Sequence, residues 1–445
     1  MEFRLADRKD LPQLKAVYKE IINHMDRQNI CIWDEIYPCE FFCDDIENNR
    51  LYVLTENGDI VSAFALCESN AGETHVKWKR KGDRALYIDR FGVNVNYLRK
   101  GIGSVMLKKA IELAKEKGAG YLRLFVVDEN VPAIKLYEKC GFVRAGGCYD
   151  EVIDEDLVLH EFGYEIETIR HIYSISKLKL ISQGNTAEVY LYDQSRVLKL
   201  FRENMPIKPI MAEYGKTVAV SLRLQNVPKV YDMVLFENRY GIIYERIIGI
   251  DMIKEMLTKA YKIKAYSKLL AQYHSELHKL SVDTNLRLEE KLSADIDASA
   301  GLTEFEKHRI KRYIYQLPKD EALCHLDFHP GNIMLRNGAP VAIDWMTACT
   351  GNSNADVART CLLLQFGELQ HANWAVRKLI AVLKKYIGDV YYDEYCRITG
   401  KAACDIEQWM LPVAAARLSE WIPDHEKAKL LRLVRDKLAL LEDKA

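Results

Sequence analysis

The first 160 residues alternate between helical and strand-like spacing of apolar side chains. From Leu11 to Ile22 apolar residues recur every three or four positions, as on one face of an amphipathic helix. The dipeptide Asn57-Gly58 between two short apolar runs is typical of a tight hairpin turn. The pattern predicts a helix, three strands, a helix, a strand and a short helix, at residues 10–24, 51–54, 60–66, 85–93, 104–117, 121–127 and 131–139. These alternating elements predict a mixed α/β domain.

A second pattern begins near Ile175 and predicts a small lobe rich in strands, followed by a large helical lobe. Its first elements are three strands, a helix and two further strands, at residues 177–182, 187–192, 196–201, 210–224, 234–237 and 241–245. From Asp251 onward the apolar spacing is mostly helical. No stretch rich in proline, glycine or serine separates the two patterns, so we expect the junction at 161–173 to continue as a strand or a helix.

The length of the chain indicates more than one domain. Its 445 residues exceed the roughly 250–300 that one hydrophobic core usually serves. We therefore expect two domains, 1–165 and 170–445, of which the second divides into an N-lobe at about 174–247 and a C-lobe at about 248–445. Hydrophobic residues make up 49 % of the chain and charged residues 29 %, a balance typical of ordered globular proteins.

Charge and cysteine usage exclude several classes of protein. The formal net charge of −1 gives no support to nucleic-acid binding. No apolar run approaches the roughly 18 residues that a membrane span needs, and the first residues lack the apolar core of a signal peptide. The eleven cysteines are scattered without a Cys-x-x-Cys motif, which favours reduced thiols over disulfides or zinc ligands. We therefore expect a cytoplasmic protein that acts on small molecules, of open oligomeric state.

The strongest chemical signal begins at Cys324 and reads His-x-Asp-x-x-x-x-Asn, with a further aspartate, Asp344, at the end of an apolar run. This spacing suits phosphoryl transfer. Asp327 can receive the proton of an acceptor hydroxyl, while the Asn332 amide oxygen and the Asp344 carboxylate can hold Mg²⁺ against nucleotide phosphates.

Residues upstream of this motif complete a nucleotide site. Lys199, in a strand-like run, can neutralise the α- and β-phosphates if a carboxylate fixes it, and Glu213 on the next helix is the natural partner. The turn between the first two strands can cover the phosphates with backbone amides and a hydroxyl; its candidates are Gly184, Asn185 and Thr186. Backbone groups at Glu245 and Ile247, where a strand ends, can meet a purine edge as a hinge does.

Together these residues resemble the aminoglycoside phosphotransferase and choline kinase-like family over about 176–445. The resemblance implies ATP or GTP with Mg²⁺, and a hydroxyl of a small molecule as acceptor. His325-Leu326 replaces the usual His-Gly, and the absence of an Ala-Pro-Glu segment after Asp344 argues against a protein substrate. We expect His325 to support the catalytic loop and Asp356 to brace it. An acidic surface for a polyamine and a solvated helical face are both open for Asp393, Glu394, Glu420, Asp424 and Glu426.

A second, unrelated signal lies in the first half. Gly101-Ile-Gly103 follows a predicted strand and opens a helix, where backbone amides can approach a pyrophosphate. Downstream, a segment places Asn130 and Tyr137 on a short helix that ends at Gly141. In this order and spacing, the two segments resemble the GCN5-related N-acetyltransferase family over about 1–160.

This resemblance assigns roles by position. The pyrophosphate of acetyl-CoA would bind the amides of Arg99, Lys100, Gly101, Ile102, Gly103 and Ser104. Phe91 and Val93, on a splayed central strand, would offer backbone contacts to the pantetheine arm. Asn130 would contact the cofactor, and Tyr137 would protonate the leaving thiolate.

Some features of the acetyltransferase site are left open by the sequence. Leu98 stands where the family usually has arginine or glutamine. Asp89, Glu35 and a water molecule are alternatives for the general base. Residues 33–38 are equally consistent with an acceptor loop and with an ordinary packing loop.

We therefore predict two fused folds, an N-terminal α/β mixed-sheet acetyltransferase fold and a two-lobed, kinase-like α+β fold. The order resembles bifunctional aminoglycoside-modifying enzymes, which acetylate an amine and phosphorylate a hydroxyl. One alternative is a metabolic kinase for choline, an amino alcohol or a sugar, fused to an acetyltransferase of unrelated substrate. Another is that one domain acts only as a ligand sensor.

Overall fold

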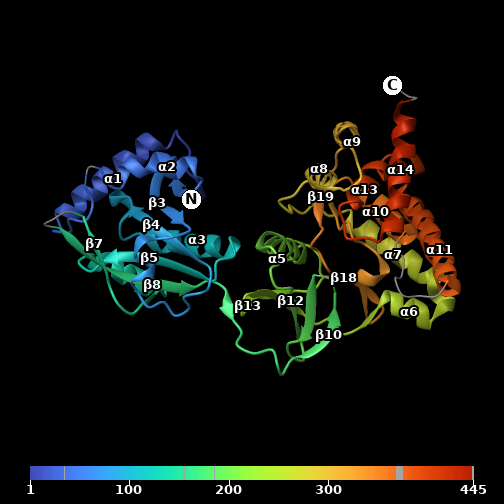
Figure 1. Cartoon of the computed structure of the whole chain (residues 1–445), viewed down its shortest axis with the longest axis horizontal. Coiled ribbons are helices and arrows are strands. Elements are labelled where there is room, and N and C mark those ends of the chain that lie inside the picture. The colour runs from blue at the N-terminus through green and yellow to red at the C-terminus, as the bar shows by residue number, and fades with distance from the viewer. Residues whose placement is uncertain (35, 154–156, 185, 367–373, 443–445) are drawn as a thin grey trace. The chain divides into compact units, whose positions relative to one another are not determined.

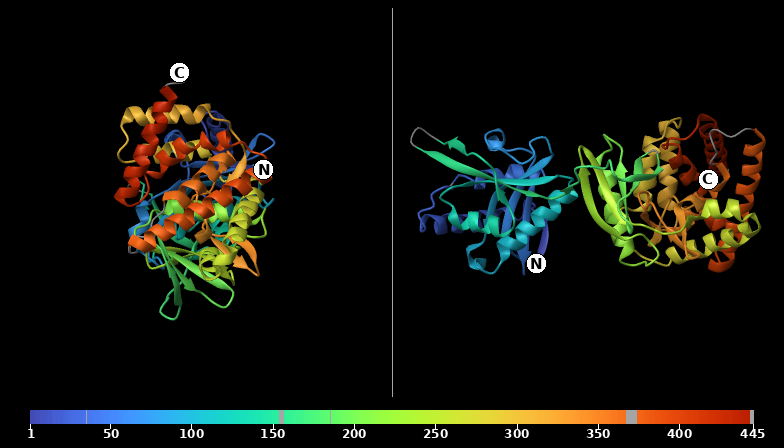
Figure 2. Two further views of the ribbon diagram at one scale, coloured as in Figure 1. Left: turned by 90° about the vertical axis from the view of Figure 1, so that its right-hand side faces the viewer. Right: turned by 90° about the horizontal axis from the view of Figure 1, so that it is seen from below.

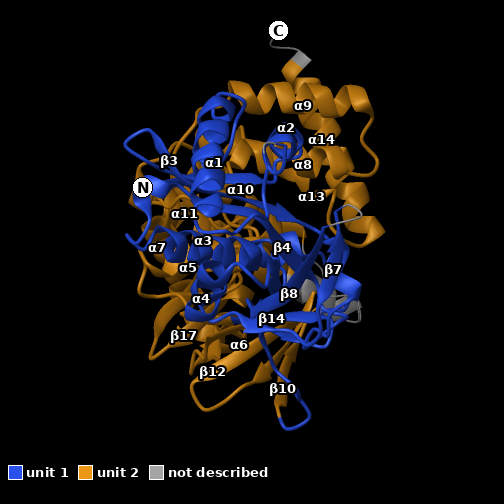
Figure 3. Cartoon of the chain, turned by 90° about the vertical axis from the view of Figure 1, so that its left-hand side faces the viewer, with its two compact units in different colours: residues 1–177, 202–211, 233–241 blue, residues 178–201, 212–232, 242–445 orange. Residues whose placement is uncertain are grey.

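The computed structural model describes the chain except residues 35, 154–156, 185, 367–373 and 443–445, and the side chains of 374–380 and 442. It contains two compact units (Figure 3). One consists of residues 1–177, 202–211 and 233–241, and the other of residues 178–201, 212–232 and 242–445. No helix in the described part of the chain is long and apolar enough to cross a membrane.

The first half of the chain forms an eight-stranded mixed sheet in the order β1-β2-β3-β4-β5-β8-β6, with β7 paired to β8 (Figure 1). Its strands are β1 (Glu2–Leu5), β2 (Leu51–Glu56), β3 (Asp59–Cys67), β4 (Ala85–Val93), β5 (Tyr121–Val127), β6 (Val143–Arg144), β7 (Tyr149–Val152) and β8 (Val158–Glu167). Its helices are α1 (Leu11–Asp26), α2 (Phe42–Glu47), α3 (Ile102–Glu116) and α4 (Val131–Lys139).

Helices cover both faces of this sheet because alternate side chains of its central strands are apolar on each side. One core joins α3 and α4 to the sheet through Met106, Leu107, Leu124 and Tyr137. The other core joins α1 and α2 through Leu14, Tyr18 and Phe42, all of which are fully buried. The predicted mixed α/β fold is therefore confirmed.

A six-stranded sheet in the order β10-β11-β12-β14-β13-β9 follows. Its strands are β9 (Arg170–His171), β10 (Lys179–Gln183), β11 (Ala187–Leu191), β12 (Arg196–Phe201), β13 (Val230–Phe236) and β14 (Arg239–Glu245). Helix α5 (Ile207–Ser221) comes directly after β12. The predicted strand at 196–201 matches β12 at both ends, and the predicted junction at 161–173 begins as the end of strand β8.

The large lobe is helical, as predicted, and its helices gather around one core (yellow to red in Figure 2). Its helices are α6 (Met252–Thr258), α7 (Ile263–Leu277), α8 (Leu288–Ala298), α9 (Glu304–Gln316), α10 (Ser353–Phe366), α11 (Trp374–Thr399), α12 (Ala403–Glu407), α13 (Met410–Arg417) and α14 (Asp424–Glu442). Five short strands lie among them: β15 (Ile250–Asp251), β16 (Ala322–Cys324), β17 (Ile333–Arg336), β18 (Ala339–Ala342) and β19 (Cys349–Gly351). The Asp327 loop runs from β16 to β17.

Candidate active sites

The lysine of β12 lies between two carboxylates. Lys199 Nζ is 2.8 Å from Glu213 Oε1 and 3.1 Å from Asp344 Oδ1. Burial alone would lower the pKa of Lys199, but Glu213 and Asp344 together raise the pKa above its ordinary value. Tyr244 at the end of β14 donates a hydrogen bond of 2.8 Å to the same Glu213 oxygen, which fixes that carboxylate from a second side. The lysine therefore stays cationic where phosphates are expected.

The loop after β16 holds Asp327 and Asn332 together. The Asn332 Nδ2 atom donates to Asp327 Oδ2 at 2.8 Å and to the Asp327 carbonyl at 2.9 Å. These bonds use the amide nitrogen, so the amide oxygen is left for a metal ion. His329 Nε2 lies 3.8 Å from the other Asp327 oxygen. The donor set of amide oxygen and Asp344 carboxylate is the hard-oxygen type that suits Mg²⁺.

Buried residues brace this loop from beneath. Asp356 on α10 accepts the backbone N–H groups of His325 at 2.5 Å and Leu326 at 2.9 Å. Two imidazoles also reach Asp356 Oδ2: His274 Nε2, on α7, at 3.1 Å, and His278 Nε2, directly after α7, at 3.3 Å. Burial, then the nearby His278, lowers the pKa of His274 to about 3, so this ring is neutral in the folded protein.

His325 joins the loop of Asp327 to the segment of Asp344. Its ring is fully buried, and its Nε2 atom lies 3.1 Å from the carbonyl oxygen of Ile343, next to Asp344. The backbone N–H of Asp327 donates to His325 Nδ1 at 3.3 Å. The supporting geometry expected for His325 is therefore present, and it links the loop of the proposed base to that of the proposed metal ligand.

The remaining nucleotide candidates lie at the small lobe. Gly184 and Thr186 are exposed in the turn between β10 and β11, and Asn185 lies outside the described residues. Glu245 donates its backbone N–H to the Lys229 carbonyl at 2.8 Å, so this N–H is already used and does not meet a purine edge. Ile247 follows β14 and is half-buried.

The acidic residues considered as a polyamine surface are largely neutralised. Glu420 pairs with Arg359 and lies 2.9 Å from Arg417 Nη1, and the buried Glu426 lies 2.6 Å from Arg417. Glu394 pairs with Arg397 at 2.7 Å and with Lys268 at 3.1 Å. Because their charges are compensated, these three glutamates contribute little attraction for a polycation.

At the acetyl-CoA candidate, α3 begins with free backbone amides. Arg99 and Gly101 both have positive φ, +59° and +81°, and the turn they form leads into Ile102 at the first position of the helix. The N–H groups of the first helical turn lack acceptors inside the helix and attract anions. The exposed Arg99 and Lys100 side chains add positive charge there.

The second glycine of this turn serves packing. A Cβ atom on Gly103 would lie 2.8 Å from Leu136 Cδ2, so the glycine lets α4 pack closely against α3. Gly101, by contrast, has open space around it and is required by its backbone conformation. The two glycines of the motif are therefore needed for different reasons.

The central strand carries a bulge where it parts from its neighbour. Parallel pairing of β4 with β5 ends at Ile88 and Leu124. Immediately beyond, the register of β4 against β3 shifts, and Arg90 has a positive φ of +52°. The bulge places Asp89 and Arg90 on one face of the sheet, and Phe91 returns to the face of Tyr137. A bulge bends its strand, which accounts for the parting of β4 and β5 beside Phe91 and Val93.

Tyr137 is buried on α4, with its ring centroid 6.2 Å from that of Phe91. Burial, with a smaller contribution from Asp89, raises the pKa of Tyr137 above its ordinary value, so the hydroxyl keeps its proton. Asn130 caps α4, since its side chain accepts the Ala133 N–H at 3.2 Å. Its amide nitrogen is therefore the group left for the cofactor.

The candidates for the general base differ in their surroundings. Asp89 accepts the Arg90 backbone N–H and Arg90 Nη1, each at 2.9 Å, and the Tyr37 hydroxyl at 3.2 Å. Its lone pairs are thus largely engaged, which disfavours it as a base. Glu35 lies outside the described residues.

A carboxyl group that the motif analysis missed lies in the first half of β8. Glu161 pairs with Val127 of β5, beside the parted strands. Burial, followed by the charges of Glu151 and Asp89, raises the pKa of Glu161 to about 8. A carboxyl group with such a pKa can accept a proton near neutral pH. Only recognition of 158–167 as a strand of this sheet would have pointed to Glu161.

Comparisons with known proteins also divide the chain into two parts. Residues 18–142 match the acetyltransferase (GNAT) family, and residues 177–395 match the phosphotransferase enzyme family that includes APH. The chain is 29 % identical to "Putative phosphinothricin acetyltransferase YwnH" of Bacillus subtilis over 33 % of its own length and 86 % of that protein.

Two further relatives are similar over smaller shares. "Probable N-acetyltransferase san" of Drosophila melanogaster is 30 % identical over 29 % of this chain and 67 % of its own length. "Streptothricin acetyltransferase" of Streptomyces lavendulae is 31 % identical over 23 % of this chain and 49 % of its own length. The chain therefore belongs to two families at once, with a GNAT acetyltransferase domain at residues 18–142 and an APH-family phosphotransferase domain at residues 177–395.

Proposed function

We propose that this chain is a bifunctional transferase that acetylates an amine from acetyl-CoA and phosphorylates a small-molecule hydroxyl from ATP or GTP. The observation that carries the proposal is Lys199 held between Glu213 and Asp344, together with the Asp327–Asn332 pair. These are the groups that phosphoryl transfer requires, and Lys199, Glu213 and Asp344 reach the site from three different segments of the chain. The two activities would reside in domains bounded at about 1–165 and 170–445.

In the kinase reaction, the acceptor hydroxyl attacks the γ-phosphorus of the nucleotide, whose bond to the β-phosphate oxygen breaks. Asp327 takes the hydroxyl proton, and Lys199 stabilises the charge on the phosphates. Asn332 and Asp344 would hold Mg²⁺, which neutralises phosphate charge when bound. The Asp356 brace keeps Asp327 in position through the loop backbone.

In the acetyltransferase reaction, the amine attacks the thioester carbonyl and the carbon–sulfur bond breaks. Glu161 would accept the amine proton, directly or through one water molecule. Tyr137 would give its proton to the departing thiolate of coenzyme A. The first turn of α3, with Arg99 and Lys100, would hold the pyrophosphate.

For the acceptor, we propose an antibiotic with amino and hydroxyl groups, of the aminoglycoside type. The fusion order and the similarity to "Streptothricin acetyltransferase" support this class. The ion pairs of Glu394, Glu420 and Glu426 favour the second candidate, an acceptor with at most one positive charge, such as choline, an amino alcohol or a neutral sugar. Because acetyl-CoA and nucleotide are both abundant in the cytoplasm, we place the enzyme there.

A mass-spectrometric screen tests the proposal. The full chain is incubated with acetyl-CoA, Mg²⁺ and ATP or GTP against aminoglycosides, streptothricin, choline, amino alcohols and sugars. Acetyl and phosphoryl mass gains on one compound support the antibiotic class, and a phosphoryl gain on choline, an amino alcohol or a sugar alone supports the second candidate. Binding of both co-substrates without any product would contradict the proposal and leave the chain as a ligand sensor.

A further inference from the structure

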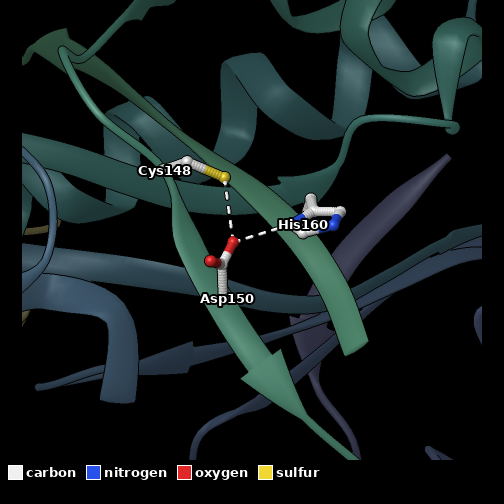
Figure 4. Close-up of side chains that lie close together, drawn as sticks. All are labelled: Cys148, Asp150 and His160. Carbon is white, nitrogen blue, oxygen red and sulfur yellow. Dashed lines mark hydrogen bonds and ion pairs between the residues drawn. The ribbon is translucent and has the colours of Figure 1, made fainter. Parts of the chain in front are cut away.

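The antiparallel ribbon of β7 and β8 carries three metal-binding side chains on one face. Asp150 of β7 is the direct cross-strand partner of His160 of β8. Cys148 precedes Asp150 by two residues, and because strand side chains alternate, both lie on the same side of the ribbon. Figure 4 shows Asp150 between the other two, with its Oδ1 atom 2.7 Å from His160 Nδ1 and 3.6 Å from Cys148 Sγ.

A fourth donor lies in the same row. The backbone N–H of Asp128 donates to the His160 carbonyl at 2.9 Å, which extends the β5–β8 ladder by one position beyond Val127 and Glu161. The carboxylate of Asp128 is near enough to act electrostatically on both Cys148 and His160. The ribbon therefore brings a thiol, a carboxylate and an imidazole together, and the continued ladder places Asp128 beside His160.

The distances fit a tetrahedral metal ion. With zinc–sulfur bonds of about 2.3 Å and bonds to nitrogen and oxygen of about 2.0–2.1 Å, tetrahedral ligands lie about 3.3–3.5 Å apart. The sulfur–oxygen distance of 3.6 Å is already close to this value. The nitrogen–oxygen distance of 2.7 Å needs to open by about 0.6 Å, which rotation of two exposed side chains can supply.

The same geometry argues against a nucleophilic cysteine. A Cys–His pair would require contact between sulfur and imidazole, whereas here the thiol and the ring both bond to the carboxylate between them. We propose that Cys148, Asp150 and His160 bind a divalent cation of the zinc class, with Asp128 as the fourth ligand. Binding would release the thiol proton to solvent. This site departs from the expectation that the cysteines serve no metal.

The ion would tie the end of the ribbon to β5. Glu161 follows His160 and therefore points to the opposite face of the same strand. A cation on one face would thus fix the strand that presents the proposed base on the other. Metal binding itself requires neither transferase activity, so the proposal can fail or hold independently of the proposed function.

Cobalt is the probe, because a thiolate ligand gives Co²⁺ a charge-transfer band. The full chain, stripped with chelator and kept in excess Mg²⁺ to fill hard-oxygen sites, is titrated with Co²⁺ and then Zn²⁺. We expect one Co²⁺ per chain with thiolate and tetrahedral absorption, displaced by Zn²⁺. Cys148→Ser should abolish the thiolate band, and His160→Gln should weaken Co²⁺ binding at least about 100-fold.

Cys404→Ser is the matched control, because Cys404 is exposed and lies 3.8 Å from a carboxylate oxygen of Asp405. It should leave the cobalt spectrum unchanged. Asp128→Asn tests the fourth ligand and should weaken binding while the thiolate band persists. Absence of the band in the parent chain, or its persistence in Cys148→Ser, would overturn the proposal.

Discussion

The candidate phosphotransferase and acetyltransferase sites are built from different parts of the polypeptide. In the kinase, Lys199, Glu213 and Asp344 come from three separate segments and meet as charged side chains within 3.1 Å. In the acetyltransferase, the main features are backbone ones: free amides at the start of α3 and a bulge in β4. A motif of residue identities therefore specifies the first site more fully than the second, and substitutions should affect the two sites differently.

The largest effect should come from Asp327→Asn. Loss of the proposed base should lower phosphorylation about 10²–10⁴-fold, whereas nucleotide affinity should stay the same because Lys199 and Asp344 are intact. Single-turnover phosphorylation and calorimetry with Mg-nucleotide measure the two. Asp436→Asn, on the exposed side of α14, is the control. A near-normal rate would remove Asp327 from the mechanism.

Tyr137→Phe tests the one side chain on which the acetyltransferase chemistry depends most. Acetyl transfer should fall about 100-fold, at the low end for loss of a general acid, and acetyl-CoA affinity should not change. The phenylalanine preserves packing against Phe91. Tyr164→Phe is the matched control, because Tyr164 lies in the same core and its hydroxyl donates a hydrogen bond to Glu138. Equal rates for parent and Tyr137→Phe would mean that water protonates the thiolate.

Glu161→Gln sharpens the assignment of the base. With the pKa of Glu161 at about 8, the carboxylate form grows as pH rises, so acetyl transfer should increase through about pH 8. The glutamine variant should lose this inflection and at least about 10-fold in rate at pH 9. Asp89→Asn is the comparison: because the Asp89 charge helps to raise the pKa of Glu161, this variant should move the inflection to lower pH without removing it. If Asp89→Asn abolishes the inflection and Glu161→Gln retains it, Asp89 is the base.

Ser104→Glu separates helix stability from anion binding. A glutamate in the first turn of α3 stabilises the helix but repels the pyrophosphate. We expect acetyl-CoA affinity to fall about 10-fold, or about 1.4 kcal/mol, while thermal stability is unchanged or higher. Ser104→Ala should bind normally. Gly103→Glu is a poorer test, because its Cβ would collide with Leu136. Unaltered affinity in Ser104→Glu would place the pyrophosphate elsewhere.

The smallest expected effect is a loss of stability of the Asp327 loop at acidic pH. His274 has a pKa of about 3 in the folded protein and an ordinary value of 6.5 in the unfolded chain. Below pH 6.5, local unfolding around His274 is therefore accompanied by protonation of its ring. Loop stability should therefore fall as pH drops from 6.5 toward 3, by up to about 1.4 kcal/mol per pH unit. Asp356 has a lowered pKa and loses its own contribution only below about 4.

Hydrogen exchange, corrected for intrinsic rates, measures this loss. Between pH 6.5 and 5.5, the equilibrium constant for local opening of the peptide covering 322–332 should rise by up to about tenfold. The β5 peptide 121–127 should change less, because it belongs to the other compact unit. An identical change in both peptides would attribute the effect to global unfolding.

Sequence patterns predicted the elements that are long enough to show a period. The predicted strands at 85–93 and 121–127 match β4 and β5, because each is a mostly apolar run of strand length. The strands β15 to β19 span two to four residues, too few for any period. Asn185, between β10 and β11, was predicted to contact the nucleotide phosphates only from its position in the sequence.

Residues of the candidate site could be predicted from the sequence where they belong to a motif with a characteristic spacing. The motif named Asp327 and Asn332, which lie 2.8 Å apart, but not His274 and His278, which reach Asp356 from a helix some 80 residues earlier. Glu161 and the positive φ of Arg90 were missed for a related reason. Their significance depends on which strand lies beside them, and a single sequence does not contain that information.

The bulge in β4 has a consequence for how such an enzyme arises. Arg90 is the extra residue: without it, Asp89 would be followed directly by Phe91, and side chains along β4 would alternate regularly between the two faces of the sheet. An ancestral chain one residue shorter at this point could form the same two cores, with β4 and β5 paired along their whole length. A single-codon insertion would then separate the strands. Sequence alignments of this fold should accordingly tolerate changes of residue at position 90 better than gaps there.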